Sequence, residues 1–194
     1  MNIKIIGLIN YLKLHGYTQL CINNKLNDID NMLGDIDLSL LNKIFIVGLD
    51  GGFIAEYFLK KNENVKVTVF ETENQIYNHI SEEYLYITYG DRINIQYTNI
   101  DEFCSKHKED KYDLIFINSD RSKKKNIEYL NITKKISHRQ TNIVMTKTNH
   151  ISNYNGAKKC WEKMLFESKI KEIGCSSKNK KNGLDMSFGK FILS

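Results

Sequence analysis

The stretch that decides the fold is Ile44-Phe-Ile-Val47-Gly48-Leu-Asp-Gly-Gly52. Its first four residues are apolar, and a short apolar run that ends in a glycine-rich turn is typical of a buried β-strand. Glycines allow the chain to turn tightly, and residues 53–61 then carry apolar side chains at helical spacing. A strand, a glycine-rich turn and a helix together predict the first unit of an α/β sheet.

The same alternation of strand and helix continues toward the C-terminus. Strands joined by crossover helices pair in parallel, whereas the last two predicted strands have no helix between them and can form an antiparallel hairpin. The sequence therefore predicts an α/β fold with a doubly wound, mostly parallel seven-stranded sheet and an antiparallel C-terminal hairpin. The predicted strands cover residues 44–47, 65–70, 93–97, 112–117, 142–145, 170–175 and 186–193, and the predicted helices cover residues 53–61, 75–86, 102–107, 124–136 and 157–166.

Residues 1–42 are predicted to form an N-terminal helical cap on the sheet domain of residues 43–194. Apolar residues at helical spacing indicate two helices in this segment, which end near Gly16 and Gly34. We expect these helices to cover an edge of the sheet or to help shape a substrate pocket.

The composition indicates a soluble globular protein. Of the 194 residues, 41% are hydrophobic and 26% are charged, which is close to the globular average. The apolar runs are too short to cross a bilayer, so no membrane segment is predicted. Lys4, Asn10 and Lys13 interrupt the apolar N-terminal residues, so no secretion signal is predicted either. The expected location is the cytoplasm.

The net charge of +5 is not by itself evidence for a nucleic-acid partner. The lysines are dispersed, and the A- and T-rich codons of lysine, asparagine and isoleucine explain the basic balance more simply. A small-molecule partner is therefore favoured over nucleic acid, and the oligomeric state stays open. The four cysteines (Cys21, Cys104, Cys160 and Cys175) form no CxxC pair, so we expect reduced thiols and no metal centre.

The loops that follow the predicted strands carry the candidate site, because open α/β sheets bind ligands beyond the carboxyl ends of their strands. The first of these loops is the glycine turn of residues 48–52. Glu71 follows the second strand about 20 residues after the turn, where an acid accepts hydrogen bonds from ribose hydroxyls. The glycine turn and Glu71 together predict a nucleoside site.

These features resemble class I S-adenosylmethionine (SAM)-dependent methyltransferases, in particular their O-methyltransferase-like branch, over roughly residues 43–194. The resemblance extends to the segments 112–121, 155–162 and 186–193, which are similar to the fourth motif, the late helix and the final hairpin strand of that family. It implies a Rossmann-like methyltransferase fold with SAM as the cofactor. The cofactor-binding residues that it implies are Gly48, Asp50, Gly51, Gly52, Glu71, Asn99, Ile100 and Asn118.

The sequence departs from the family pattern at three places. Ile46 stands where the family usually has an acid that contacts the methionine amino group, and Asp50 is a partial substitute. Asn118 replaces the usual aspartate of the fourth motif. The segment 146–149 lacks the carboxylate that metal-dependent members use, so we predict no divalent metal. These departures leave open whether activity is retained.

Methyl transfer to a hydroxyl or an amine is helped by a general base. Asp120, after the fourth strand, is the first candidate, and His150, after the fifth strand, is the second. The structural alternative for Asp120 is an acid that stabilises a helix N-terminus, and for His150 it is a loop side chain in solvent.

Two other functions remain open at this stage. The turn Leu49-Asp-Gly-Gly52 is similar to that of spermidine synthases, which implies aminopropyl transfer from a decarboxylated relative of SAM. Against this reading, the N-terminal β-domain of those enzymes is absent, and Asn118 replaces their usual catalytic acid. The second alternative is a non-catalytic, Rossmann-like binding module with eroded motifs.

Overall fold

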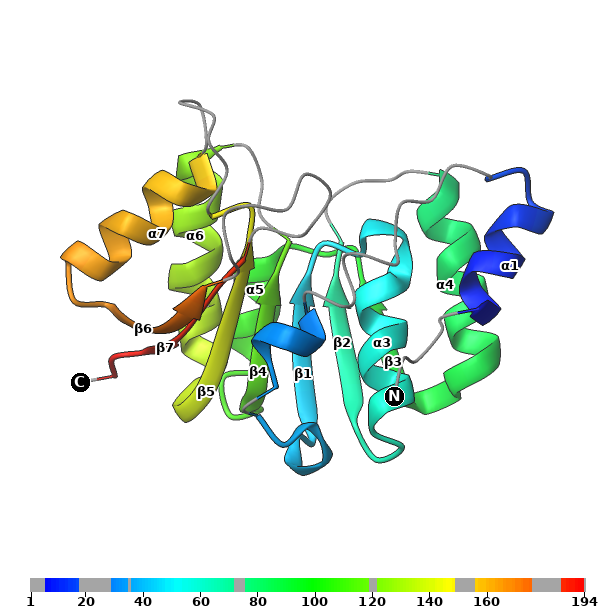
Figure 1. Ribbon diagram of the computed structural model, residues 1–194, viewed down its shortest axis with the longest axis horizontal. Helices are drawn as coiled ribbons and strands as arrows, with labels where there is room; N and C mark the ends of the chain where they lie inside the picture. Colours follow the sequence, from blue (N-terminus) through cyan, green and yellow to red (C-terminus); the bar gives the residue numbers. More distant parts are fainter. Residues whose placement is uncertain are drawn as a thin grey trace.

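The computed structural model contains one seven-stranded sheet in the order β3-β2-β1-β4-β5-β7-β6 (Figure 1). The structure describes residues 6–17, 29–34, 36–71, 76–118, 122–148, 156–175 and 186–193. The strands are β1 (Lys43–Val47), β2 (Lys66–Phe70), β3 (Ile93–Gln96), β4 (Tyr112–Ile117), β5 (Ser137–Thr146), β6 (Ile170–Cys175) and β7 (Met186–Phe191). The helices are α1 (Ile6–Leu14), α3 (Phe53–Lys61), α4 (Ile76–Tyr89), α5 (Ile100–Lys106), α6 (Lys123–Thr133) and α7 (Gly156–Phe166), with short 3₁₀ turns η1 (Leu38–Leu40), η2 (Asp50–Gly52), η3 (Gly90–Arg92) and η4 (Lys134–Ile136).

The pairing of the strands confirms the predicted doubly wound fold. β1 pairs in parallel with β2 and β4, β2 pairs with β3, and β4 pairs with β5. β7 lies antiparallel between β5 and β6, so the C-terminal hairpin is the predicted antiparallel part of the sheet. The chain builds outward from β1 to β3 on one side and from β4 on the other, which places a topological switch point between β1 and β4.

Helices cover both faces of the sheet, and the alternation of β1 side chains shows why. Ile44 and Ile46 pack in one buried cluster with residues of α1, α3 and α4. Phe45 and Val47 point to the opposite face and pack in a second cluster with residues of α5, α6 and α7. Because successive side chains of a strand point to opposite faces, a strand that is apolar throughout must be covered on both sides.

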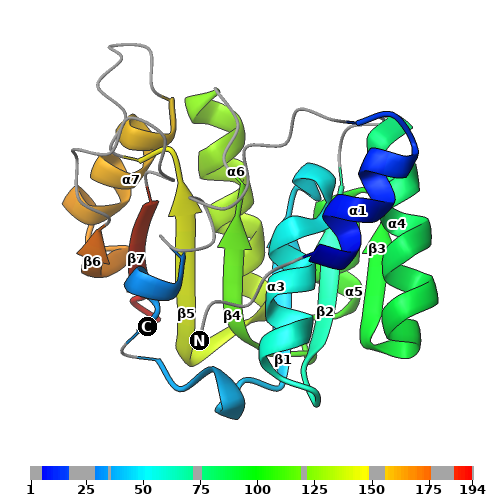
Figure 2. The same cartoon turned by 45° about the vertical axis from the view of Figure 1, so that its right-hand side comes forward.

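The N-terminal segment packs against the α3–α4 side of the sheet. Leu8 and Leu12 of α1 are fully buried, and Figures 1 and 2 show α1 beside α4 at the β3 end of the sheet. Asp30 holds the next helical turn to α3, since its carboxylate accepts a 2.5 Å hydrogen bond from the Tyr57 hydroxyl and pairs with Lys61 at 2.7 Å. Parts of the segment 1–42 lie outside the described residues, and its boundary as a separate cap stays a prediction.

None of the described helices is long and apolar enough to span a membrane. In the described part of the chain, no group of three histidine, cysteine, aspartate or glutamate side chains is placed to hold a metal ion.

The buried thiols give a first testable prediction. Cys104 and Cys160 are fully buried, and burial raises the pKa of their thiols to about 12 and about 11, whereas Cys175 is exposed. Because the thiolate is the reactive form, iodoacetamide at about pH 8 is expected to label Cys175 and to spare the two buried thiols until the protein unfolds. Peptide mass mapping checks this, and rapid labelling of Cys104 in the folded protein would contradict the packing.

Candidate functional site

The glycine turn after β1 has an unusual backbone that explains its sequence. Gly48, Gly51 and Gly52 have φ angles of +87°, +72° and +79°, and Asp50 lies between them at +43°. This left-handed region is readily accessible to glycine and disfavoured for other residues. The turn is anchored at its start, because the Gly48 N–H donates to the Phe70 carbonyl at 2.7 Å. The turn therefore lies at the carboxyl ends of β1 and β2.

Asn118, directly after β4, supports the turn from the other side. Its Nδ2 group donates a 2.7 Å hydrogen bond to the Gly48 carbonyl, and its own N–H donates to the Val47 carbonyl at 2.9 Å. A Cβ atom on Gly48 would lie only 3.0 Å from the Cβ of Asn118. A glycine at position 48 thus lets β4 approach the turn, and the amide side chain of Asn118 is used to hold it.

Glu71 lies against the same turn, at the end of β2. Its side chain is 5% exposed, and its Oε2 atom accepts a 2.7 Å hydrogen bond from the Leu49 N–H. Its backbone N–H donates to the Gln96 carbonyl at 2.9 Å, which fixes the residue beside the end of β3. The two features that predict a nucleoside site in the sequence are therefore in direct contact.

A third residue, which the sequence analysis missed, joins this contact. Asn78 of α4 is 1% exposed, and its Nδ2 donates to Glu71 Oε2 at 3.1 Å. Its Oδ1 accepts a 3.3 Å hydrogen bond from the Gly51 N–H. The signal in the sequence was an asparagine inside a predicted helix seven residues after Glu71, and such a residue is read as surface unless its burial is known.

Asn99 and Ile100 follow β3 at the same edge of the sheet. Asn99 caps α5, since its Oδ1 accepts hydrogen bonds from the N–H groups of Asp101 and Glu102 at 2.9 and 3.2 Å. Ile100 is 7% exposed and packs in the α5–α7 cluster. A structural role therefore accounts for Asn99, and its contact with an adenine stays a prediction.

Carboxylates give the β2–β3 side of the edge a negative character. The Tyr97 hydroxyl donates a 2.7 Å hydrogen bond to Glu82, and the Tyr97 ring lies 5.9 Å from the His79 ring. Burial, the hydrogen bond to Glu82 and the charges of Glu82 and Glu71 raise the pKa of Tyr97 well above its ordinary value. A surface of this character favours hydrogen-bond donors, such as the hydroxyls of a ribose.

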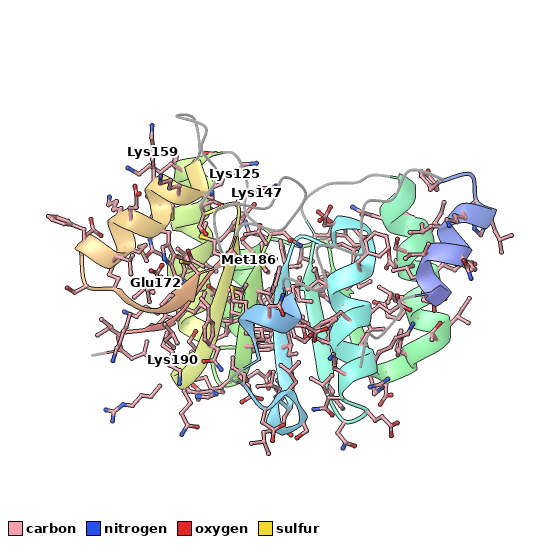
Figure 3. All side chains as sticks on the ribbon, in the orientation of Figure 1. Lys125, Lys147, Lys159, Glu172, Met186 and Lys190 are labelled. Carbon is pink, nitrogen blue, oxygen red and sulfur yellow. The ribbon has the colours of Figure 1, made fainter. Side chains whose placement is uncertain are left out.

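The segment after β5 carries positive charge instead of negative charge. Lys147 has a left-handed backbone with φ +61° and an exposed side chain. Figure 3 shows Lys147 at the carboxyl edge of the sheet, with Lys125 of α6 and Lys159 of α7 near the same edge. Thr148 is 3% exposed, and its hydroxyl has no hydrogen-bond partner among the described residues. The two predicted bases, Asp120 and His150, lie outside the described residues, beyond the ends of β4 and β5.

No protein-family model matches the sequence. No curated protein matches it significantly.

Solved structures match the fold over nearly the whole chain. A protein from Staphylococcus aureus described as a candidate caffeoyl-CoA O-methyltransferase has a TM-score of 0.72 at 14% identity, covering 98% of this chain and 93% of that one. An O-methyltransferase from Bacillus cereus in complex with SAH has a TM-score of 0.71 at 16% identity, covering 97% and 92%. An O-methyltransferase from Streptomyces achromogenes involved in tomaymycin synthesis, in complex with SAM, has a TM-score of 0.65 at 13% identity, covering 95% and 87%. The chain therefore has the Rossmann-like fold of class I, O-methyltransferase-like proteins.

Proposed function

We propose that the chain binds SAM at the glycine turn and transfers its methyl group to a small-molecule acceptor. The observation that carries the proposal is the contact of Glu71 with the Leu49 N–H at 2.7 Å, at the carboxyl ends of β2 and β1 and beside the switch point of the sheet. It holds a buried carboxylate beside a turn whose glycines allow a ligand to approach the backbone. O-methyltransferases of the same fold that are seen with SAM or SAH support this assignment.

The residues of the site fit such a cofactor. Glu71 would accept hydrogen bonds from the ribose hydroxyls, and the turn of residues 48–52, which includes Asp50, would lie against the methionine part of the cofactor. Asn99 and Ile100 would border the adenine, and Asn118 would hold the turn in place. The sulfonium of the bound cofactor supplies the activated methyl group, so the protein has to orient the acceptor and exclude water.

For the acceptor, we propose Asp120 as the general base and His150 as the second candidate. We further propose that the transfer needs no divalent metal. β5 ends at Thr146 and the chain continues with Lys147 and Thr148, so this part of the sequence offers a cation and two hydroxyls but no carboxylate for a metal ion.

The test is a calorimetric titration of the purified protein with SAM. Binding in the micromolar range is expected, unchanged after EDTA treatment, and weaker binding is expected for decarboxylated SAM. An acceptor screen with SAH formation as the readout then follows. The absence of binding at millimolar SAM would overturn the proposed function. Tighter binding of the decarboxylated compound would point instead to aminopropyl transfer, and activity lost in EDTA and restored by magnesium would overturn metal independence.

A further inference from the structure

Asn78 connects the two halves of the proposed cofactor site. It is placed by the first turns of α4, it is 1% exposed, and both polar atoms of its amide are used. Nδ2 donates to Oε2 of Glu71 at 3.1 Å, and Oδ1 accepts from the N–H of Gly51 at 3.3 Å. One side chain thus holds the carboxylate at the end of β2 and the backbone of the turn after β1.

The turn has a specific need for such a support. Residues 50–52 have three successive left-handed backbones, and glycine-containing segments lose much conformational freedom when they are ordered. Oε2 of Glu71 accepts two hydrogen bonds, from Leu49 and from Asn78, which orients the carboxylate. A site whose groups are held in place before the ligand arrives binds that ligand more tightly, because less conformational entropy is lost on binding.

We propose that Asn78 is a positioning residue of the cofactor site: it orients Glu71 toward the ribose and fixes the glycine turn before SAM binds. The inference rests on the proposed function. An amide meets both requirements, since it carries a donor for the carboxylate and an acceptor for the backbone N–H at the same end of a side chain. Alanine offers neither group, and aspartate keeps the acceptor but places a second carboxylate next to Glu71.

The first experiment compares Asn78→Ala with Asn62→Ala. Asn62 is also buried and donates to the carbonyls of Leu38 and Ser39 in the 3₁₀ turn η1 and of Leu41 directly after it, close to the start of β1 at Lys43. Both variants are expected to lose stability. SAM binding at a temperature where both are folded is expected to weaken about tenfold in Asn78→Ala alone, because this variant loses the hydrogen bonds that hold Glu71 and Gly51.

Hydrogen exchange without ligand provides a second readout of the same proposal. The N–H groups of Leu49 and Gly51 are expected to exchange about tenfold faster in Asn78→Ala, because the turn opens more often when the side chain is removed. In Asn62→Ala the exchange of these two groups should change only as much as the global stability changes.

The variant Asn78→Asp separates orientation from packing, because it conserves shape. At about pH 8 two carboxylates about 3 Å apart repel each other, so SAM binding is expected to fall more than tenfold. At about pH 5.5 the coupled pair takes up a proton, the new carboxyl can donate to Glu71, and affinity relative to wild type is expected to recover. Among the described residues, the titratable side chains near this pair are His79 and Glu82 of α4, Tyr97 after β3 and Asp50 in the turn, and wild type measured at the same two pH values is the control for their effect.

The outcomes distinguish this proposal from the proposed function. If wild type does not bind SAM, the proposed function fails, and the positioning role fails with it. If wild type binds SAM but Asn78→Ala and Asn78→Asp bind it equally well, with unchanged exchange at Leu49 and Gly51, Asn78 is only a packing residue. Weaker binding in both variants, with a pH-dependent recovery in Asn78→Asp alone, supports the positioning role.

Discussion

Replacing Glu71 by alanine is expected to weaken SAM binding about 100-fold, which corresponds to about 2.7 kcal/mol. Hydrogen bonds to a charged acceptor each contribute about 1.5–3 kcal/mol, and the variant removes the acceptor for the ribose hydroxyls. It also leaves the buried N–H of Leu49 and the amide of Asn78 without their shared partner, so the turn itself becomes less ordered. Calorimetric titration of the variant beside wild type measures the change.

Two further variants show which property of Glu71 matters. Glu71→Gln keeps an oxygen that can accept from Leu49, so its affinity is expected to lie between those of wild type and Glu71→Ala. Glu167→Ala removes the same charge from a surface position, where the carboxylate pairs with Lys163 and Lys169 at 3.4 and 2.6 Å. Its affinity should equal that of wild type. If Glu71→Ala and wild type bind SAM with equal affinity, Glu71 does not contact the ribose.

The sheet could be predicted because each of its strands carries a strong local pattern. Apolar runs such as Ile44–Val47 and Leu114–Ile117 are buried on both faces, and this requirement leaves a clear trace in sequence. The largest difference concerns β5: the sequence predicts a strand over residues 142–145, whereas β5 begins at Ser137. Its first part is polar and pairs with β4 only through Tyr112 and Ser137, with an irregular register, so hydrophobicity does not mark it.

Helix ends were less predictable, for physical reasons that differ from case to case. The helix expected to begin at Glu102 begins at Ile100, because the Asn99 side chain accepts hydrogen bonds from the N–H groups of Asp101 and Glu102 and so caps the first turn. The helix expected to end at residue 136 changes after Thr133 into a 3₁₀ turn, and the two conformations share the same apolar spacing over one turn.

The candidate site, like the fold, could be predicted from the sequence only in part. The glycine turn and Glu71 could be proposed from sequence, because backbone conformation and strand order constrain which residues stand there. Asn78 could not, because its role depends on where α4 lies over the turn, and this placement comes from packing of distant segments. Leu8 of α1 and Leu85 of α4 both lie near Gly52, so the N-terminal helix contributes to the support of the turn.

Gly52→Ala is expected to destabilise the protein by about 3 kcal/mol, the sum of about 1 kcal/mol for a left-handed alanine and about 2 kcal/mol for overpacking. Gly52 has φ +79°, and a Cβ atom there would lie 3.0 Å from Leu85 Cδ1, 3.3 Å from Ser81 Cβ and 3.4 Å from Leu8 Cδ2. For a chain of this length the melting temperature should fall by about 9 °C. Thermal unfolding followed by circular dichroism measures the shift.

Gly90→Ala is the matched control, because it separates backbone strain from packing. Gly90 also has a left-handed backbone, with φ +56°, but no atom of the residues that the structure describes lies within 4 Å of the position of its Cβ. Its replacement should cost only the conformational part, about 1 kcal/mol, or about 3 °C. Equal shifts for Gly52→Ala and Gly90→Ala would mean that α1 and α4 do not pack tightly on the glycine turn. The larger shift at Gly52 is expected because the turn is held between these helices as well as by its hydrogen bonds to Glu71 and Asn78.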